Sequence, residues 1–168
     1  MSSSTTTNKR MEIDMKKLLM NGYKVELIDN SIQNFNVELH GPKDSLYEGF
    51  VWRVMVKLDD NHPYKRPSIE FVDRIFHPNI GDKENDRSVF LNVLTYEWSP
   101  VFDMLNVFEI FIPQLLLYPN PHDPSNGNCE AAYLMCLNPI EYQQKVKEYC
   151  EKYAKRVNAP DEASRIGD

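Results

Sequence analysis

Apolar residues near the N-terminus recur at helical spacing. They fall at i, i+4, i+7 and i+8 between Asn8 and Gly22, which predicts a helix that begins at Asn8 and stops at Gly22. The apolar face of this helix comprises Met11, Met15, Leu18 and Leu19. Residues 1–7 (MSSSTTT) are nearly all small and polar, and we predict that they form a disordered tail.

Four stretches after Gly22 alternate between apolar and polar residues, which is typical of strands. They are residues 23–27, 35–39, 50–58 and 68–72. The third stretch is apolar at nearly every position, as expected for a central strand. The connections are too short for parallel crossovers, so the four strands are predicted to form an antiparallel meander.

The period becomes helical again after residue 103. Met104–Leu117 is apolar nearly all round, which predicts a buried helix, and Pro113 within it predicts a kink or a local break. Tyr118–Pro124 contains three prolines and is predicted to be an extended, rigid loop. A second helix is predicted over Asn128–Leu137, and Asn138 is the predicted N-cap of a third.

One helix, four strands and then further helices predict an α+β fold. The chain has 168 residues, of which 42% are hydrophobic, and this is enough for one domain with a sizeable core. No internal repeat or linker divides it. We therefore predict one domain over residues 8–155, followed by a polar C-terminal tail over residues 156–168.

Composition excludes several classes of partner and cofactor. The net charge of -6 and the pI of about 5.3 argue against nucleic acid, which requires a basic surface. No apolar run approaches the ~20 residues of a membrane span. The three cysteines, an odd number, indicate reduced thiols and a location in the cytoplasm, the nucleus or both. The cysteines and four histidines lack metal-ligand spacing, so no metal or cofactor is expected.

The most informative segment is Phe76–Pro100, FHPNIGDKENDRSVFLNVLTYEWSP. It contains a His-Pro-Asn corner, a charged loop, an apolar stretch that we interpret as strand-like, and Trp-Ser-Pro. This order resembles the active-site segment of ubiquitin-conjugating enzymes, in which the tryptophan lies eight residues after the catalytic cysteine. Counting back eight residues from Trp98 leads to Phe90. The resemblance therefore places a phenylalanine at the position of the nucleophile.

Further motifs support the same resemblance, which extends over residues 9–154. Pro63–Pro67 is similar to the family's Pro-aromatic-x-x-Pro loop, and Tyr118–Pro124 is similar to the loop that faces its active site. These motifs resemble most closely the histone-directed branch of the family. The resemblance implies the ubiquitin-conjugating enzyme (UBC) fold: an N-terminal helix, a four-stranded antiparallel meander, and then central and C-terminal helices.

The family's reaction requires a group that attacks an acyl carbon and then leaves, as a thiolate does and a phenyl ring does not. No cysteine lies between Met1 and Asn128. Two further departures surround Phe90: Asn92 stands where the family usually has aspartate, and the Gly81–Arg87 loop is longer by about two residues. The ring of Phe90 is expected either to fill the groove for the ubiquitin tail or to fold inward as core.

Two other residues match the family's catalytic positions. Asn79 corresponds to the asparagine that stabilises the oxyanion or orders the adjacent loop, although an Asn after Pro also serves turn backbone groups. Asp123 corresponds to the acidic residue that positions the incoming lysine, and the alternative is a local turn before Pro124. His77 is interpreted as a packing and hydrogen-bonding residue.

A relocated nucleophile is the enzymatic alternative. Cys129 stands at a predicted helix start, where amide donors and the helix dipole favour a thiolate, although an ordinary cysteine is the simpler interpretation. Cys136 and Cys150 occupy apolar helical positions and are predicted to be core.

The resemblance also implies binding surfaces. Tyr64 and Pro100 match the loop tips that meet RING-type ubiquitin ligases, unless Tyr64 packs on its own loop. Lys9 and Arg10 match the basic helix start used for the activating enzyme and ligases. Expected partners are ubiquitin or a ubiquitin-like modifier, a ligase, the activating enzyme and an active conjugating enzyme. We interpret the chain as a pseudoenzyme that regulates or binds within the ubiquitin pathway. The alternative is an active enzyme that uses Cys129.

Overall fold

The computed structural model describes residues 2–123 and 127–157, with side chains from residue 9 onward. The first half comprises α1 (Ser2–Met20), β1 (Val25–Ile28), β2 (Ser31–His40), β3 (Phe50–Lys57) and β4 (Ser68–Phe71). The second half comprises α2 (Asn92–Thr95), α3 (Met104–Asn106), the π-helix η1 (Val107–Phe111), α4 (Ile112–Leu117), α5 (Cys129–Leu137), α6 (Pro139–Tyr153) and β5 (Lys155–Arg156). The α+β class predicted from the sequence is confirmed.

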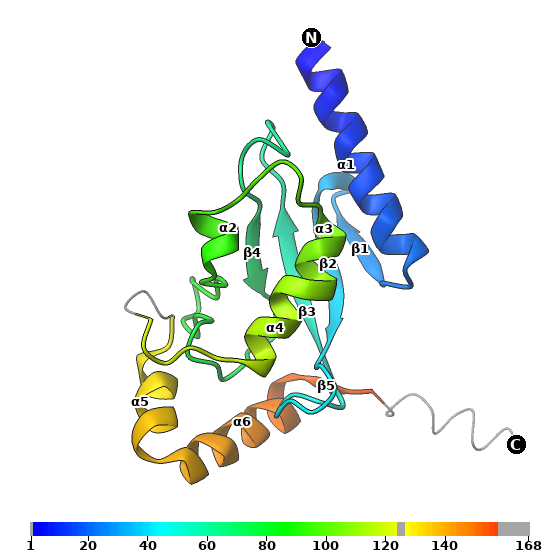
Figure 1. Ribbon diagram of the computed structural model, residues 1–168. Helices are drawn as coiled ribbons and strands as arrows, with labels where there is room; N and C mark the ends of the chain where they lie inside the picture. The colour runs from blue at the N-terminus through cyan, green and yellow to red at the C-terminus, as the bar shows by residue number, and fades with distance from the viewer. Residues whose placement is uncertain (1, 124–126, 158–168) are drawn as a thin grey trace, which may run out of the picture.

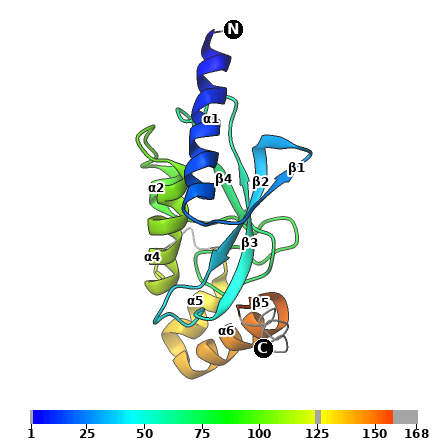
Figure 2. The same ribbon diagram turned by 90° about the vertical axis from the view of Figure 1, so that its right-hand side faces the viewer.

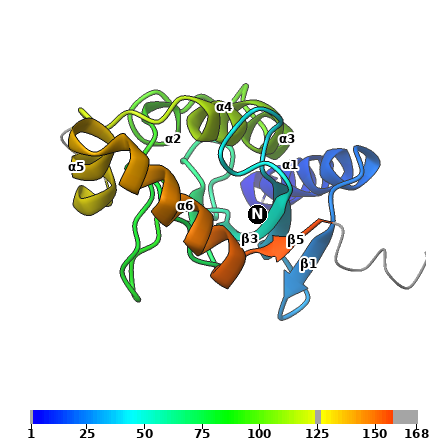
Figure 3. The ribbon, with the colours of Figure 1, turned by 90° about the horizontal axis from the view of Figure 1, so that it is seen from below.

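The four predicted strands form the expected antiparallel meander in the order β1-β2-β3-β4. Alternate side chains of β2 and β3 enter the core, as the period-2 pattern predicts: Phe35, Val37, Leu39, Trp52, Val54 and Val56 are all buried. Helices α1 and α3–α4 cover one face of this sheet (Figures 1 and 2). Helix α6 crosses beneath its end (Figure 3). The core therefore lies between one sheet face and the helices.

Both chain ends differ from the sequence prediction. Helix α1 begins at Ser2, so residues 2–7 belong to the helix and the predicted tail over them is wrong. On the predicted apolar face, Leu19 is exposed while its three partners are buried. At the other end, Arg156 belongs to β5 and pairs with Phe50 of β3, so the predicted tail does not start at residue 156. Residues 1 and 158–168 lie outside the described part.

The predicted break in the central helix takes the form of a π-helical segment. Five residues, Val107–Phe111, have π-helical bonding immediately before α4, which carries Pro113. Proline has no N–H with which to bond the carbonyl four residues earlier, so the helix adjusts its bonding around this position. Asp103 and Asn106 start the helix with reciprocal side-chain bonds to each other's backbone N–H.

The stretch after the His-Pro-Asn corner is not a strand, contrary to our interpretation. Its pairing is limited to isolated bridges such as Ile80 with Val89, and it ends in the short helix α2. The resulting irregular path carries Phe90 and Leu91 toward α4, and both side chains line the groove described below.

The C-terminal helices begin as predicted, with Asn128 capping α5 and Asn138 capping α6 through side-chain oxygens. Cys150 is buried in the core, as predicted. Cys136, however, is exposed, so its predicted core position is wrong. Apart from Glu130, helix α5 consists of apolar residues, but only Ala131, Ala132 and Leu134 are buried, and the sequence pattern alone does not identify the buried side.

Candidate active-site groove

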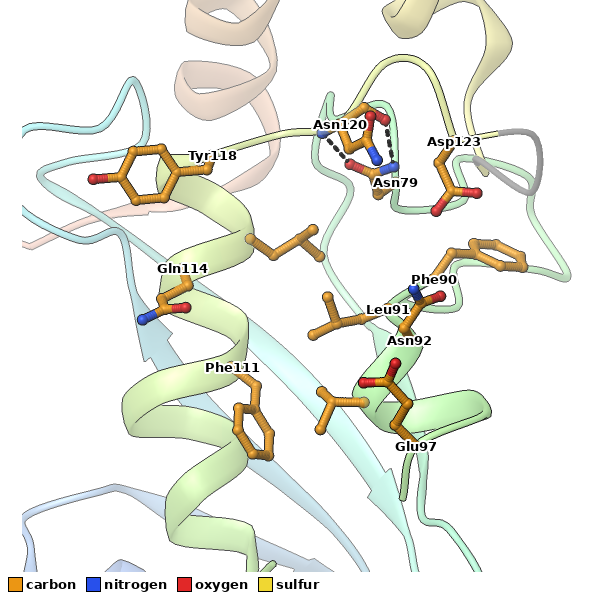
Figure 4. Close-up of a pocket in the computed structure, with 12 residues that line it drawn as sticks. Asn79, Phe90, Leu91, Asn92, Glu97, Phe111, Gln114, Tyr118, Asn120 and Asp123 are labelled. Carbon is orange, nitrogen blue, oxygen red and sulfur yellow. Dashed lines mark hydrogen bonds between the residues drawn. The ribbon is translucent and has the colours of Figure 1, made fainter. Parts of the chain in front are cut away.

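A groove of about 390 Å³ separates α4 from the segment around α2, and the loop after α4 closes one end (Figure 4). It brings together Asn79, Phe90 and Asp123, three of the residues predicted from the sequence. The other lining residues are Leu91, Asn92, Val93, Glu97, Phe111, Gln114, Leu115, Tyr118 and Asn120. Its floor is thus largely apolar and its rim is rich in amides and carboxylates.

His77 fixes the corner that supports this groove. Its ring is fully buried, Nε2 donates to the carbonyl of Leu115 at 2.9 Å, and Nδ1 accepts from the N–H of Asn79 at 3.0 Å. Burial lowers the pKa of His77 to about 4, although the bond to the Leu115 carbonyl opposes this shift. The neutral ring therefore joins the corner to the central helix. Its expected packing and hydrogen-bonding role is confirmed.

Asn79 joins the corner to the loop above the groove. Its Nδ2 donates to the carbonyl of Asn120 at 2.8 Å, and its Oδ1 accepts from the N–H of Asn120 at 2.8 Å (Figure 4). The side chain is buried, so water does not replace these bonds. Both ends of the amide thus bind the loop, which favours the loop-ordering alternative over oxyanion stabilisation.

Phe90 is half-buried at the edge of the groove. Its N–H donates to the carbonyl of Asn79 at 2.8 Å, which fixes the backbone at this point. The ring lies so close to Gly127 that a Cβ there would be 2.8 Å from ring atom Cε2 and 2.6 Å from the backbone N of Gly81. The ring thus neither folds fully into the core nor projects freely. It packs against Gly127.

Carboxylates stand on the groove's rim. Asp123 is half-buried and its side chain lies above Phe90, whereas Glu97 is exposed farther along the same wall (Figure 4). The local-turn alternative for Asp123 involves Pro124, which lies outside the described residues. Sequence reasoning missed Glu97 and Asn120. The proline-rich loop Tyr118–Pro124 was the sequence signal that could have led to Asn120. No sequence signal pointed to Glu97.

None of the three cysteines is among the described residues that line the groove. Cys129 is exposed as the first residue of α5, and it is not among the described residues that line the groove. Burial raises the pKa of Cys150 to about 12, with a smaller contribution from the charge of Glu151. The described lining of the groove therefore contains no thiol.

The expected binding surface lies at two loop tips at the other end of the sheet from α6. Tyr64 is 70% exposed, so the alternative in which it packs on its own loop is wrong. Pro100 is exposed, and Tyr96 and Val101, which sequence reasoning missed, are also strongly exposed. Exposed apolar side chains of this kind are suited to protein contacts.

Lys9 and Arg10 differ from each other. Lys9 is exposed, as a partner-binding residue requires. Arg10 is directed inward, because its guanidinium donates to the carbonyls of Pro100 and Phe102 at 2.8 and 2.6 Å. The guanidinium of Arg10 thus has partners within the chain, and its contact with the activating enzyme or ligases stays a prediction.

A second network fixes the long 81–87 loop. Arg74 donates two bonds to the carboxylate of Asp82 at 2.8 and 2.9 Å, and a third to the hydroxyl of Tyr153 at 2.8 Å. Its guanidinium lies over the rings of Tyr149 and Tyr153 in α6. The loop is thereby joined to the C-terminal helix.

Within the described residues, no group of three or more His, Cys, Asp or Glu side chains could hold a metal ion. None of the helices in that part is both long and apolar enough to cross a membrane.

Comparisons with known proteins agree with this architecture. A family model described as ubiquitin-conjugating enzyme matches residues 6–150. Ubiquitin-conjugating enzyme E2 5 of Arabidopsis thaliana is 55% identical, over 90% of this chain and 80% of its own length. Ubiquitin-conjugating enzyme E2-24 kDa of Saccharomyces cerevisiae is 48% identical, over 89% of this chain and 67% of its own. Among solved structures, the E2 domain of a Toxoplasma gondii ubiquitin conjugating enzyme has a TM-score of 0.79 and 26% identity, covering 88% of this chain and 99% of that one.

Proposed function

The chain belongs to the ubiquitin-conjugating enzyme family, and we propose that it is a non-catalytic member that acts as a binding or regulatory module in the ubiquitin pathway. The observation that carries this proposal is Phe90. It occupies the nucleophile position by its spacing from Trp98, and its side chain lies in the groove beside Asn79 and Asp123.

The chemistry of acyl transfer supports the proposal. A thioester forms only if a thiolate attacks the activated carboxyl carbon and later leaves, and no atom of a phenyl ring does either. The described groove residues supply carboxylates, amides and apolar carbons, but no sulfur. Positioning groups such as Asn79 do not replace the missing nucleophile, because they act on a bond that must form first.

Partner binding does not require the nucleophile. Tyr64, Pro100 and Lys9 remain exposed, so a RING-type ligase or the activating enzyme has accessible contacts. The open, half-apolar groove offers space for the tail of ubiquitin or a ubiquitin-like modifier. In this proposal the protein works by occupying ligases or by pairing with an active conjugating enzyme, in the cytoplasm or nucleus. The motifs over Pro63–Pro67 and Tyr118–Pro124 support the proposal that it belongs to the histone-directed branch.

One observation favours the enzymatic alternative with Cys129. Gly127, two residues before it, packs directly on the ring of Phe90. The start of α5 therefore lies beside the nucleophile position, and the thiol of Cys129 is exposed there. A ubiquitin thioester on this thiol is the outcome that this alternative requires.

A charging reaction decides between the two proposals. Wild-type protein and Cys129→Ser are incubated with activating enzyme, ubiquitin and ATP, and each product is run on a gel without reducing agent. The non-catalytic proposal expects no thiol-sensitive band of one added ubiquitin in either lane. A band present in wild type and lost in Cys129→Ser replaces it with the relocated nucleophile.

A further inference from the structure

Three charged side chains on one face of α1 are directed toward two loops. Arg10, Asp14 and Lys17 follow each other at i, i+4 and i+7, the spacing of a single helix face. The loops are residues 58–67, between β3 and β4, and residues 98–103, between α2 and α3, and they carry the exposed tips described above. In Figure 1 the second loop runs over the end of the sheet toward α1.

Arg10 binds the second of these loops. The two terminal nitrogens of its guanidinium donate to the carbonyls of Pro100 and Phe102, and Nε donates to Asp14 at 2.9 Å. A planar fork with fixed donor directions sets the position of a loop more narrowly than one flexible ammonium does. Lys17 adds a bond to Asp103 at 2.8 Å, at the point where the loop enters α3.

Asp14 binds the first loop from the same helix face. It is fully buried, and its second oxygen receives a 2.7 Å bond from Nε2 of the equally buried His62. His62 precedes Pro63 and Tyr64, so this bond anchors the loop immediately before its exposed tip. Trp98 joins the two loops directly, because its Nε1 donates to the carbonyl of Pro63 at 2.8 Å.

The buried pair is poorly explained by stability alone. Nδ1 of His62 is buried without a hydrogen-bond partner among the described residues, which is a cost that an apolar side chain would avoid. Apolar residues of similar volume often replace buried polar or ionic pairs without loss of stability. A hydrogen bond to a carboxylate, by contrast, fixes the direction and the register of the groups that it joins.

We propose that Arg10, Asp14 and His62 form a clamp that holds Tyr64 and Pro100 in one fixed relative position, which is the geometry that a RING-type partner recognises. The three are positioning residues, because they act through the two loops and not by touching the partner. The identity of the partner, a RING-type ligase, depends on the proposed function. The positioning of the two loops by these three residues depends only on the contacts described above.

The test uses two variants of the full chain and a matched control. Asp14→Asn keeps the shape of the side chain and removes its charge, and Arg10→Met removes the three guanidinium bonds from a side chain that is 23% exposed. The control, Arg53→Met, removes an arginine that pairs with Asp73 at 2.7 Å on the sheet, away from both loops. Backbone amide exchange is measured in the two loops and in β2 and β3. Affinity is measured for a RING domain that binds wild type.

In Asp14→Asn and Arg10→Met we expect amide exchange in both loops to accelerate at least tenfold, while β2 and β3 keep wild-type rates. RING affinity falls at least fivefold, and Arg53→Met changes neither quantity. Loop exchange within twofold of wild type overturns the clamp, and so does acceleration spread equally over loops and sheet. Loosened loops with unchanged RING affinity overturn its role in recognition.

Amide exchange also separates this proposal from the proposed function. If no RING domain binds the wild-type chain, the ligase-facing surface fails as a function. The exchange rates of the two loops still decide whether Arg10 and Asp14 hold them. If Asp14→Asn does not fold, Arg10→Met carries the test, because the Arg10 side chain is partly exposed and Asp14 keeps its hydrogen bond to His62 when Arg10 is replaced.

Discussion

Replacing Phe90 by cysteine is expected to give a folded protein that accepts ubiquitin as a thioester. Truncating a fully buried phenylalanine costs about 3–5 kcal/mol. Phe90 is half-buried and its ring packs against Gly127, so we expect a loss of about 1–2 kcal/mol. A domain with an ordinary stability of roughly 5–15 kcal/mol tolerates this loss.

Charging of Phe90→Cys is expected to be slow, and discharge to lysine slower still. The amide of Asn79 is bound to Asn120 at both ends, and Asn92 stands where the family usually has an acidic residue. Fewer neighbouring side chains are therefore available to assist the reaction of the new thiol than in an active family member. The assay follows the thioester band over time on gels without reducing agent, and urea unfolding measures the stability of the same preparation.

A matched control places the thiol elsewhere in the same groove. Asn92 is exposed and lines the groove two residues from Phe90, so Asn92→Cys supplies a sulfur that is off the nucleophile position. We expect it not to charge. A folded Phe90→Cys that never charges refutes the reasoning, because the defect then extends beyond the missing sulfur. Equal charging of both variants shows that Phe90 is not the nucleophile position.

Three further substitutions test other parts of the account. Tyr64→Ala should weaken RING binding by at least ~1 kcal/mol at unchanged stability. Tyr133 in α5 is similarly exposed, and Tyr133→Ala should change neither binding nor stability. Equal RING binding by wild type and both variants removes Tyr64 from the binding surface. Asn79→Ala should lower the free energy of unfolding, measured in urea, by about 2–4 kcal/mol, because the backbone N–H and C=O of Asn120 both lose their partner. A loss below ~1 kcal/mol contradicts the loop-ordering role. Burial lowers the pKa of His77 to about 4 in the folded chain. Between pH ~6.5 and ~4 the unfolded chain therefore binds a proton at His77 that the folded chain does not. The free energy of unfolding should fall by about 3 kcal/mol as the pH is lowered over this range. An unchanged pH slope in His77→Gln argues against this assignment.

The meander was predictable because its signal is local. Alternation in β2 and β3 reports one buried face, and short connections leave few other topologies. The start of α1 at Ser2 was not predictable in this way. Serine and threonine favour caps and turns over helix interiors, so a run of them does not indicate a helix. Helix α2 was missed for a similar reason, since four residues are too few to show a period.

The site was only partly predictable. Asn79, Phe90 and Asp123 were found through motif spacing, and they do line one groove. The internal bonds of Arg10 were missed because its partners lie 90 and 92 residues away, and a charged residue on a helix has the same sequence pattern whether it faces solvent or a loop. The bond between Asp14 and His62 is equally non-local.

The charging state of the unmodified wild-type chain tests the absence of catalysis most directly. The wild-type chain is incubated with activating enzyme, ubiquitin and ATP in the absence of reductant, and its mass is measured by intact-protein mass spectrometry. Phe90→Cys, treated in the same way, is the positive control. With Phe90 at the nucleophile position, the wild-type chain is expected to keep its unmodified mass while the variant gains one ubiquitin. A wild-type species heavier by one ubiquitin, and lost on addition of a thiol reductant, would contradict the non-catalytic assignment.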